Sequence, residues 1–160
     1  MPTTKITIKP HLAEYSMSKW NKDETNYVAF PSNTDLYITV FDLLQKRPAD
    51  CQHDFGNLEI AIPNRRADED TGFRKNPEIY NYLSSRSCRI VERRIETLFW
   101  ADVHQFIDER KIKGIEYIES IHTFLCLYKI ESITEDALIK NYYRWRENIR
   151  KRTKRKYQRK

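Results

Sequence analysis

Glycine is scarce in this sequence, and long apolar runs are absent. Only 3 of the 160 residues are glycine, which argues against glycine-rich phosphate loops and against a β-barrel with many tight turns. The longest apolar run, FLCLY at 124–128, is far shorter than the roughly 20 residues that span a membrane. The N-terminal sequence MPTTKITIKPHLAEY has no uninterrupted apolar stretch of the signal-peptide type. We therefore expect an intracellular, cytoplasmic protein that does not contact membranes.

Cysteine is also sparse. The sequence contains Cys51, Cys88 and Cys126, which are widely spaced, odd in number and without a CxxC pair. This pattern predicts reduced thiols rather than a disulfide framework. We expect two of the three to be buried on helices, and we interpret all of them as unreactive, because no basic surroundings are apparent around Cys51 or Cys126.

Sequence motifs of enzymes are missing. No HxH pair, GxSxG, Walker sequence or CxxC occurs. Asp54 and Glu59 flank a predicted strand as in a metal-dependent nuclease, but the lysine that this arrangement needs is replaced by Ala61. Cys51 and His53 have no second pair at zinc-finger spacing. We therefore predict no catalytic residues, no metal and no cofactor, with a nuclease as the minor alternative.

Two further groups of titratable residues have structural interpretations. His104 and His122 are flanked by apolar residues of predicted helices, so we expect them in the core or at its boundary. The acidic run DED at 68–70 lies in a polar stretch, so we expect a solvated acidic patch.

What is present is enough apolar sequence for a core: 39% of the residues are hydrophobic and 12% aromatic. Alternating apolar residues predict strands at 5–9, 27–30 and 57–62. Helical spacing predicts a short helix after Pro10, a second helix capped by Ser32 or Thr34, and a long helix over 84–113 that buries Val91, Ile95, Leu98, Val103 and Phe106. Residues 115–130 are apolar nearly all round, which predicts a central buried helix.

These elements predict an α+β fold: a small three-stranded N-terminal sheet with helices, followed by a C-terminal three-helix bundle. We expect one domain over 1–149 and a basic tail at 150–160. Within the domain, residues 1–62 form the strand and helix part, 63–77 a loop and 78–149 the helical part.

Positive charge is concentrated at the C-terminal end. The net charge is +6, yet residues 140–160 carry eleven basic residues against one acid, Glu147, so that this stretch has a charge of +10 and the preceding residues −4. Such segregation indicates a polyanionic partner.

The last predicted helix begins after Thr134, which can cap it. Leu138, Tyr142, Trp145 and Ile149 share one face and are predicted to pack on the protein body. Core contact should end near Ile149, and the like charges beyond it should make the free end fray.

We predict a non-enzymatic nucleic-acid-binding protein, with DNA favoured over RNA, in which the remaining cations of this helix and tail grip the phosphate backbone. An arginine cluster at the start of the long helix would assist them, unless it pairs with Glu92, Glu96 and the acids at 68–70. The predicted binding residues are Lys140, Arg144, Arg146, Arg150, Lys151, Arg152, Lys154, Arg155 and Lys156, together with Arg86, Arg89 and Arg93.

Other interpretations of the basic end remain open. It is also typical of a solvated tail, or of an interaction module whose tail docks on an acidic protein while the body forms a homodimer. Residues 118–146 follow the order of a helix-turn-helix, although the connection contains no glycine and the leading end of the second helix carries Glu135 and Asp136. We therefore favour contact through the C-terminal half of that helix.

Overall fold

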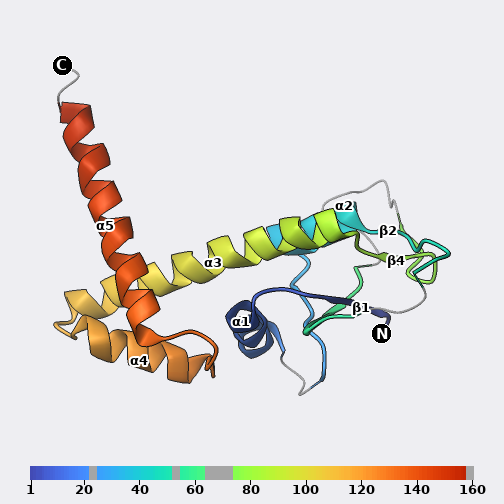
Figure 1. The fold of residues 1–160 in the computed structure, drawn as a ribbon, viewed down its shortest axis with the longest axis horizontal. Coiled ribbons are helices and arrows are strands. Elements are labelled where there is room, and N and C mark those ends of the chain that lie inside the picture. Colours follow the sequence, from blue (N-terminus) through green and yellow to red (C-terminus); the bar gives the residue numbers. More distant parts are fainter. Residues whose placement is uncertain (22–24, 52–54, 64–73, 158–160) are drawn as a thin grey trace. The chain divides into compact units, whose positions relative to one another are not determined.

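A computed structural model describes residues 1–21, 25–51, 55–63 and 74–157, with side chains described through Arg155. The elements (Figure 1) are β1 (Thr3–Ile6), α1 (Pro10–Trp20), α2 (Asp35–Leu43), β2 (Gln45–Lys46), β3 (Leu58–Ala61), β4 (Tyr80–Tyr82), α3 (Ser85–Ile112), α4 (Tyr117–Leu127) and α5 (Glu135–Tyr157). The fold is α+β, with small antiparallel two-stranded sheets in the N-terminal half and three packed helices after them. The chain divides into two compact units, Met1–Phe99 and Trp100–Lys160. The predicted single domain over 1–149 with a tail at 150–160 stays a prediction.

The predicted three-stranded sheet is wrong in detail. β1 pairs antiparallel with β3, with Thr3 opposite Ala61 and Ile6 opposite Leu58. The segment 27–30 forms only an isolated parallel bridge to Ile60 through Val28, whose N–H donates to the Glu59 carbonyl at 2.8 Å. Pro31 follows at once and has no N–H to donate, so the pairing is not extended. The β1–β3 contact also explains Gly56, where any Cβ would overlap the backbone of Ile6.

A second antiparallel pair, β2 with β4, was not predicted. β2 contains only two residues, both exposed, and the register shifts between them. So short a strand has no measurable alternation of apolar and polar residues, and its pairing depends on contacts distant in sequence.

Local sequence signals begin α1 and α2 as predicted. Pro10 occupies the first turn of α1, where its missing N–H is harmless. Thr34 caps α2 by accepting a hydrogen bond from the Tyr37 N–H at 3.3 Å. At the other end of α2, the Lys75 ammonium donates to the carbonyls of Phe41 and Leu44, at 2.5 and 3.0 Å. Lys75 therefore serves the C-terminus of a helix, where a cation is favourable.

α3 buries one side chain in every turn: Val91, Ile95, Phe99, Val103 and Ile107 are fully buried. Leu98, which we predicted as core, is 38% exposed, and Phe106 is only half-buried. The spacing of four residues selects Phe99 rather than Leu98 for the stripe, because successive positions four apart remain on one face.

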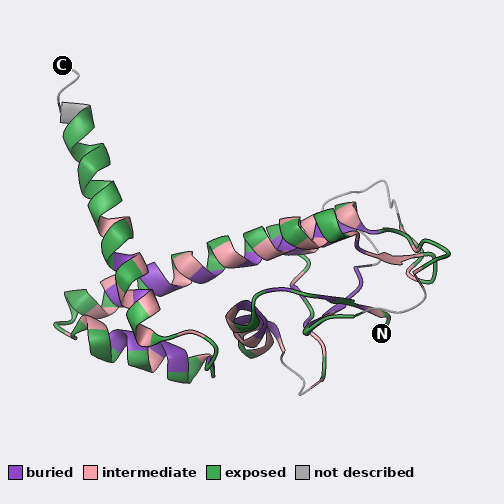
Figure 2. Cartoon of the chain, in the orientation of Figure 1, coloured by how far each residue is buried: buried purple, intermediate pink, exposed green. Residues whose placement is uncertain are grey.

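α4 is not the central buried helix that its composition predicts. Ile121, Phe124 and Leu125 face the interior, whereas Ile118 and Leu127 are each 60% exposed, as the alternating colours of this helix show (Figure 2). Gly114, at φ +80°, reverses the chain between α3 and α4 in a conformation that favours glycine. None of the helices within the described residues has the length and apolar character to cross a bilayer.

Candidate nucleic-acid interface

The start of α5 is fixed by local contacts that the sequence predicted. Thr134 Oγ1 accepts a hydrogen bond from the Ala137 N–H at 3.2 Å, which caps the helix. Glu135 and Asp136 occupy the first turn, where negative charge complements the helix dipole. These contacts set the direction in which the basic part of the helix continues.

The first half of α5 is held by packing within its unit. Leu138 and Tyr142 are buried, and the Tyr142 hydroxyl donates to Asp108 at 2.6 Å. Burial, together with this hydrogen bond, raises the pKa of Tyr142. Trp145 stacks on His104 with ring centroids 4.2 Å apart. Core contact was predicted to reach Ile149, but Ile149 is 43% exposed, so the packed face ends a turn earlier, at Trp145.

The second half of α5 remains helical as far as Tyr157. We expected the chain beyond Ile149 to fray because of repulsion between like charges. Arg and Lys have high helix propensity, and no glycine or proline interrupts residues 147–157. An ion pair between Glu147 and Lys151, at 2.9 Å, adds an interaction along this half.

The predicted cations of α5 fall into three groups. Lys140 and Lys151 are exposed but pair with an acid one turn earlier, Asp136 at 2.7 Å and Glu147 at 2.9 Å. A second group is exposed and forms no ion pair with a described carboxylate. It consists of Arg144, Arg150, Arg152, Lys154 and Arg155. The green C-terminal half of α5 in Figure 2 includes most of this group. The side chain of Lys156 lies outside the described residues.

Arg146 forms the third group by itself. The residue is half-buried, and its guanidinium donates to the Tyr117 hydroxyl at 2.8 Å and lies over the Tyr142 ring at 5.7 Å. Arg146 therefore joins α5 to the start of α4, and it differs from the exposed cations in being engaged within the fold.

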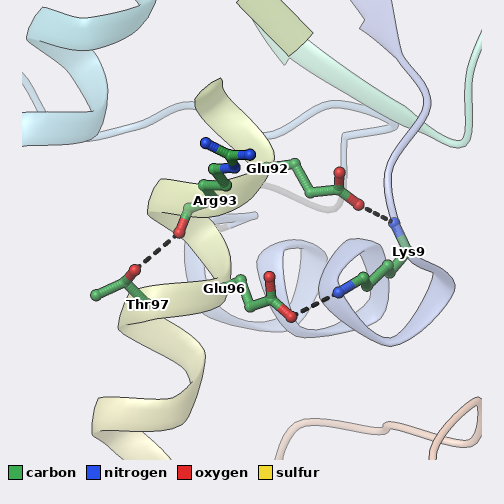
Figure 3. Close-up of polar contacts among 5 residues, drawn as sticks. All are labelled: Lys9, Glu92, Arg93, Glu96 and Thr97. Atoms are coloured by element: carbon green, nitrogen blue, oxygen red, sulfur yellow. Dashed lines mark hydrogen bonds and ion pairs between the residues drawn. The ribbon is translucent and has the colours of Figure 1, made fainter. Parts of the chain in front are cut away.

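The arginine cluster of α3 lies in the other unit. Arg86, Arg89 and Arg93 are exposed and pair with no described acid. The competing interpretation was that these arginines pair with Glu92 and Glu96. Both carboxylates instead bind Lys9 (Figure 3). Glu92 accepts from the Lys9 backbone N–H at 2.9 Å, and Glu96 accepts from the Lys9 ammonium at 2.6 Å. The acids at 68–70 lie outside the described residues.

A pocket adjoins this cluster. It has a volume of about 510 Å³, and Lys5, Ser85, Arg89 and Glu92 contribute to its lining. Ser84 caps α3 by accepting from the Ser87 N–H at 3.2 Å. Lys5 pairs with Glu59 at 3.7 Å, so the pocket carries both signs of charge beside the positive end of the α3 dipole.

The alternative chemistries have few residues to support them. Glu59 accepts a hydrogen bond from Thr3 at 2.5 Å and pairs with Lys5, while Asp54 and His53 lie outside the described residues. Within the described part of the chain, no three His, Cys, Asp or Glu side chains are placed to hold a metal ion. His104 is buried as predicted, and burial lowers its pKa.

Two predictions about α4 are wrong. His122, expected in the core or at its boundary, has a side chain that is 67% exposed, and Cys126 is exposed rather than buried. Their spacing of four residues on a helix places them together, with the Cys126 sulfur 3.6 Å from His122 Nε2. A histidine and a cysteine four residues apart on a predicted helix are a sequence signal that their side chains lie together. Cys51 and Cys88 are half-buried.

Comparison with known protein families, with curated proteins and with solved structures finds no match to this chain.

Proposed function

We propose that this protein binds nucleic acid without catalysing a reaction, and that the C-terminal half of α5 holds the phosphate backbone. The observation that carries the proposal is the run of exposed cations on a helix that continues past its packed face. Arg144, Arg150 and Arg155 are examples with no described carboxylate to neutralise them. Phosphate contacts of this kind position a protein on nucleic acid and dominate its affinity.

A helical rather than an extended basic end favours duplex DNA over duplex RNA. An α-helix with side chains is roughly 10–12 Å across, and the B-DNA major groove is about 12 Å wide. The major groove of A-form RNA is deep and narrow, so a helix cannot enter it in the same way. The last eleven described residues of α5 span about 16 Å at 1.5 Å per residue, close to half a turn of B-DNA.

The same stretch gives little support to membrane adsorption. An interfacial helix needs an apolar face beside its cations. Beyond Ile149 the sequence is RKRTKRKY, in which no aliphatic residue occurs. α4 and α5 also follow the order of a helix-turn-helix, but Glu135 and Asp136 at the leading end of α5 would repel phosphate. We therefore assign the contact to the C-terminal half.

The α3 cluster supplies a second group of cations for the same ligand class. Arg86, Arg89 and Arg93 lie on successive turns of one helix, and the pocket of Arg89 also contains Lys5. Substituting the three arginines with glutamine should weaken binding, although less than loss of the α5 cations, because fewer positive charges are removed.

A truncation after Ile149 tests the proposal. Binding of the intact chain to duplex DNA, single-stranded DNA and duplex RNA is measured by fluorescence anisotropy at several salt concentrations. If about six phosphates are contacted, affinity should fall roughly 10³-fold between 50 and 200 mM salt, and the truncated chain should lose most of it.

A full-length variant provides the matched control. Substituting glutamine at Arg150, Lys151, Arg152, Lys154 and Arg155 keeps the length and much of the helix propensity while removing the charge. Equal binding by this variant and the intact chain, or no binding by the intact chain to any oligonucleotide, would exclude the proposal. Capture of an acidic protein in place of oligonucleotides would instead favour an interaction module.

A further inference from the structure

A thiol, an imidazole and a carboxylate meet on the surface of the second unit, outside the basic C-terminal half of α5. Cys126 Sγ lies 3.6 Å from His122 Nε2, and His122 Nδ1 lies 2.8 Å from Glu135 Oε1. His122 and Cys126 share one face of α4, and Glu135 is the first residue of α5. The packing of α4 against α5 therefore brings the carboxylate next to the imidazole and the thiol.

The order of the three groups defines the hydrogen bonds. The carboxylate of Glu135 can only accept, so Nδ1 of His122 carries the proton that it donates. In the neutral imidazole this leaves Nε2 as an acceptor facing the thiol of Cys126. A base beside a nucleophile, held in place by a third group, is the arrangement that activates a thiol.

A pocket lies beside the sulfur. It has a volume of about 430 Å³ and is lined by Cys126, by the apolar side chains of Leu125 and Ile130, and by charged residues that include Lys129 and Glu131. Lys129 adopts φ 51°, and hydrogen bonds from its N–H and that of Ile130 to the end of α4 fix this wall. The pocket has the size of a small-molecule site and carries both signs of charge.

We propose that Cys126 is a site of thiol–disulfide exchange with a low-molecular-weight disulfide that bears amino and carboxylate groups. His122 Nε2 takes the thiol proton, and the Cys126 sulfur attacks one sulfur of the disulfide. The S–S bond breaks, and the departing thiolate takes the proton from His122. The products are a mixed disulfide on Cys126 and one free small thiol, so that atoms and electrons balance. Glu135 stabilises the intermediate imidazolium.

The position of Cys126 makes the base necessary. The residue lies in the last turn of α4 and not at the N-terminus of that helix, so the positive end of the α4 dipole does not face its sulfur. A cysteine at a helix N-terminus would react through its own ionised form. We therefore expect the rate of exchange at Cys126 to depend on His122. A cysteine that reacts only because it is exposed would not show this dependence.

Glutathione disulfide is the probe that tests this proposal. The intact chain is incubated with it at pH 7, and intact-mass and peptide mass spectrometry follow the modification of each cysteine. Because a base lies beside the Cys126 sulfur, we expect Cys126 to react first and His122→Gln to slow its reaction roughly tenfold. Glu135→Gln should give a smaller fall, and Cys126→Ser should abolish the fast phase.

Cys88 provides the internal control, because it is half-buried and donates to the Leu83 carbonyl. Cys88→Ser should leave the fast phase unchanged. The proposal is overturned if Cys126 reacts no faster than the other two cysteines, or if His122→Gln reacts at the rate of the intact chain. His122 is exposed, so its substitution should leave the fold intact.

Discussion

The two halves of α5 share one continuous helix but are stabilised in different ways. The first half, residues 135–146, is capped by Thr134. It contains buried Leu138 and Tyr142, and its Trp145 stacks on His104. Residues 147–157 have no buried side chain among those described, and their sequence is dominated by cations. The first half is therefore a helix because of tertiary packing, whereas the second half depends on intrinsic propensity and on the helix that precedes it.

This difference predicts that stability and the proposed ligand binding can be changed separately along one helix. Removing a buried side chain from residues 135–146 should reduce stability without changing the charge offered to a ligand. Removing charge from residues 147–157 should change binding with little effect on stability.

The largest effect is expected from Leu138→Ala. Leu138 is fully buried, and deletion of such a side chain costs about 2–5 kcal/mol in the free energy of unfolding. Urea denaturation followed by tryptophan fluorescence measures it, and DNA affinity under native conditions should be unchanged. Ile149→Ala is the control: at 43% exposure it should alter stability by no more than about 0.5 kcal/mol. Equal costs at the two positions would contradict the boundary at Trp145.

A triple substitution tests the second half of α5. Changing Arg150, Arg152 and Arg155 to glutamine should lower DNA affinity roughly 10²-fold at 0.1 M salt and flatten the salt dependence by about 0.9 per lost contact. Titrations at several salt concentrations give both values. An unchanged slope would mean that these arginines do not meet phosphates. Arg146→Gln is the informative comparison, because its guanidinium binds Tyr117 and its loss should reduce stability instead.

Lowering the pH is expected to have a smaller effect on the free energy of unfolding. Burial lowers the pKa of His104, so the unfolded chain takes up a proton more readily than the folded one. The free energy of unfolding should therefore decrease as the pH falls below about 6.5, the ordinary value for histidine. His104→Phe keeps a ring beside Trp145 and should reduce this dependence when denaturation is measured between pH 7 and 5. An identical pH profile in the variant would show that His104 does not contribute.

The smallest effect is expected from Glu147→Gln. The hydrogen bond from Lys151 lowers the pKa of Glu147, the one acid within residues 140–160. Its neutralisation should weaken the helix only slightly, because the pair is exposed. It should also release Lys151 and raise DNA affinity modestly, as measured by anisotropy at low salt. Weaker binding by this variant would indicate that the ion pair orders the contact surface.

Much of the helical framework could be predicted from local chemistry. Thr34 and Thr134 begin their helices as caps, Pro10 opens α1, and Gly114 follows the end of α3. These signals act over a few residues, so the sequence displays them directly.

Features that depend on distant contacts could not be predicted in the same way. The pairing of β2 with β4 joins residues far apart in the chain, and the exposure of Ile118 and Leu127 depends on which face of α4 meets its neighbours. For the candidate interface, composition located the cations. It could not reveal that Arg146 binds Tyr117, because that contact requires α4 and α5 to be packed together.

Lys9 has an influence beyond the two contacts that it makes. By binding Glu92 and Glu96, it holds both carboxylates in contacts of its own, and neither of them pairs with Arg93 (Figure 3). A neutral residue at position 9 would free the Glu96 carboxylate, the partner of the Lys9 ammonium, to turn toward an arginine of α3. The charge that α3 presents is therefore expected to depend on a residue some eighty positions earlier in the chain.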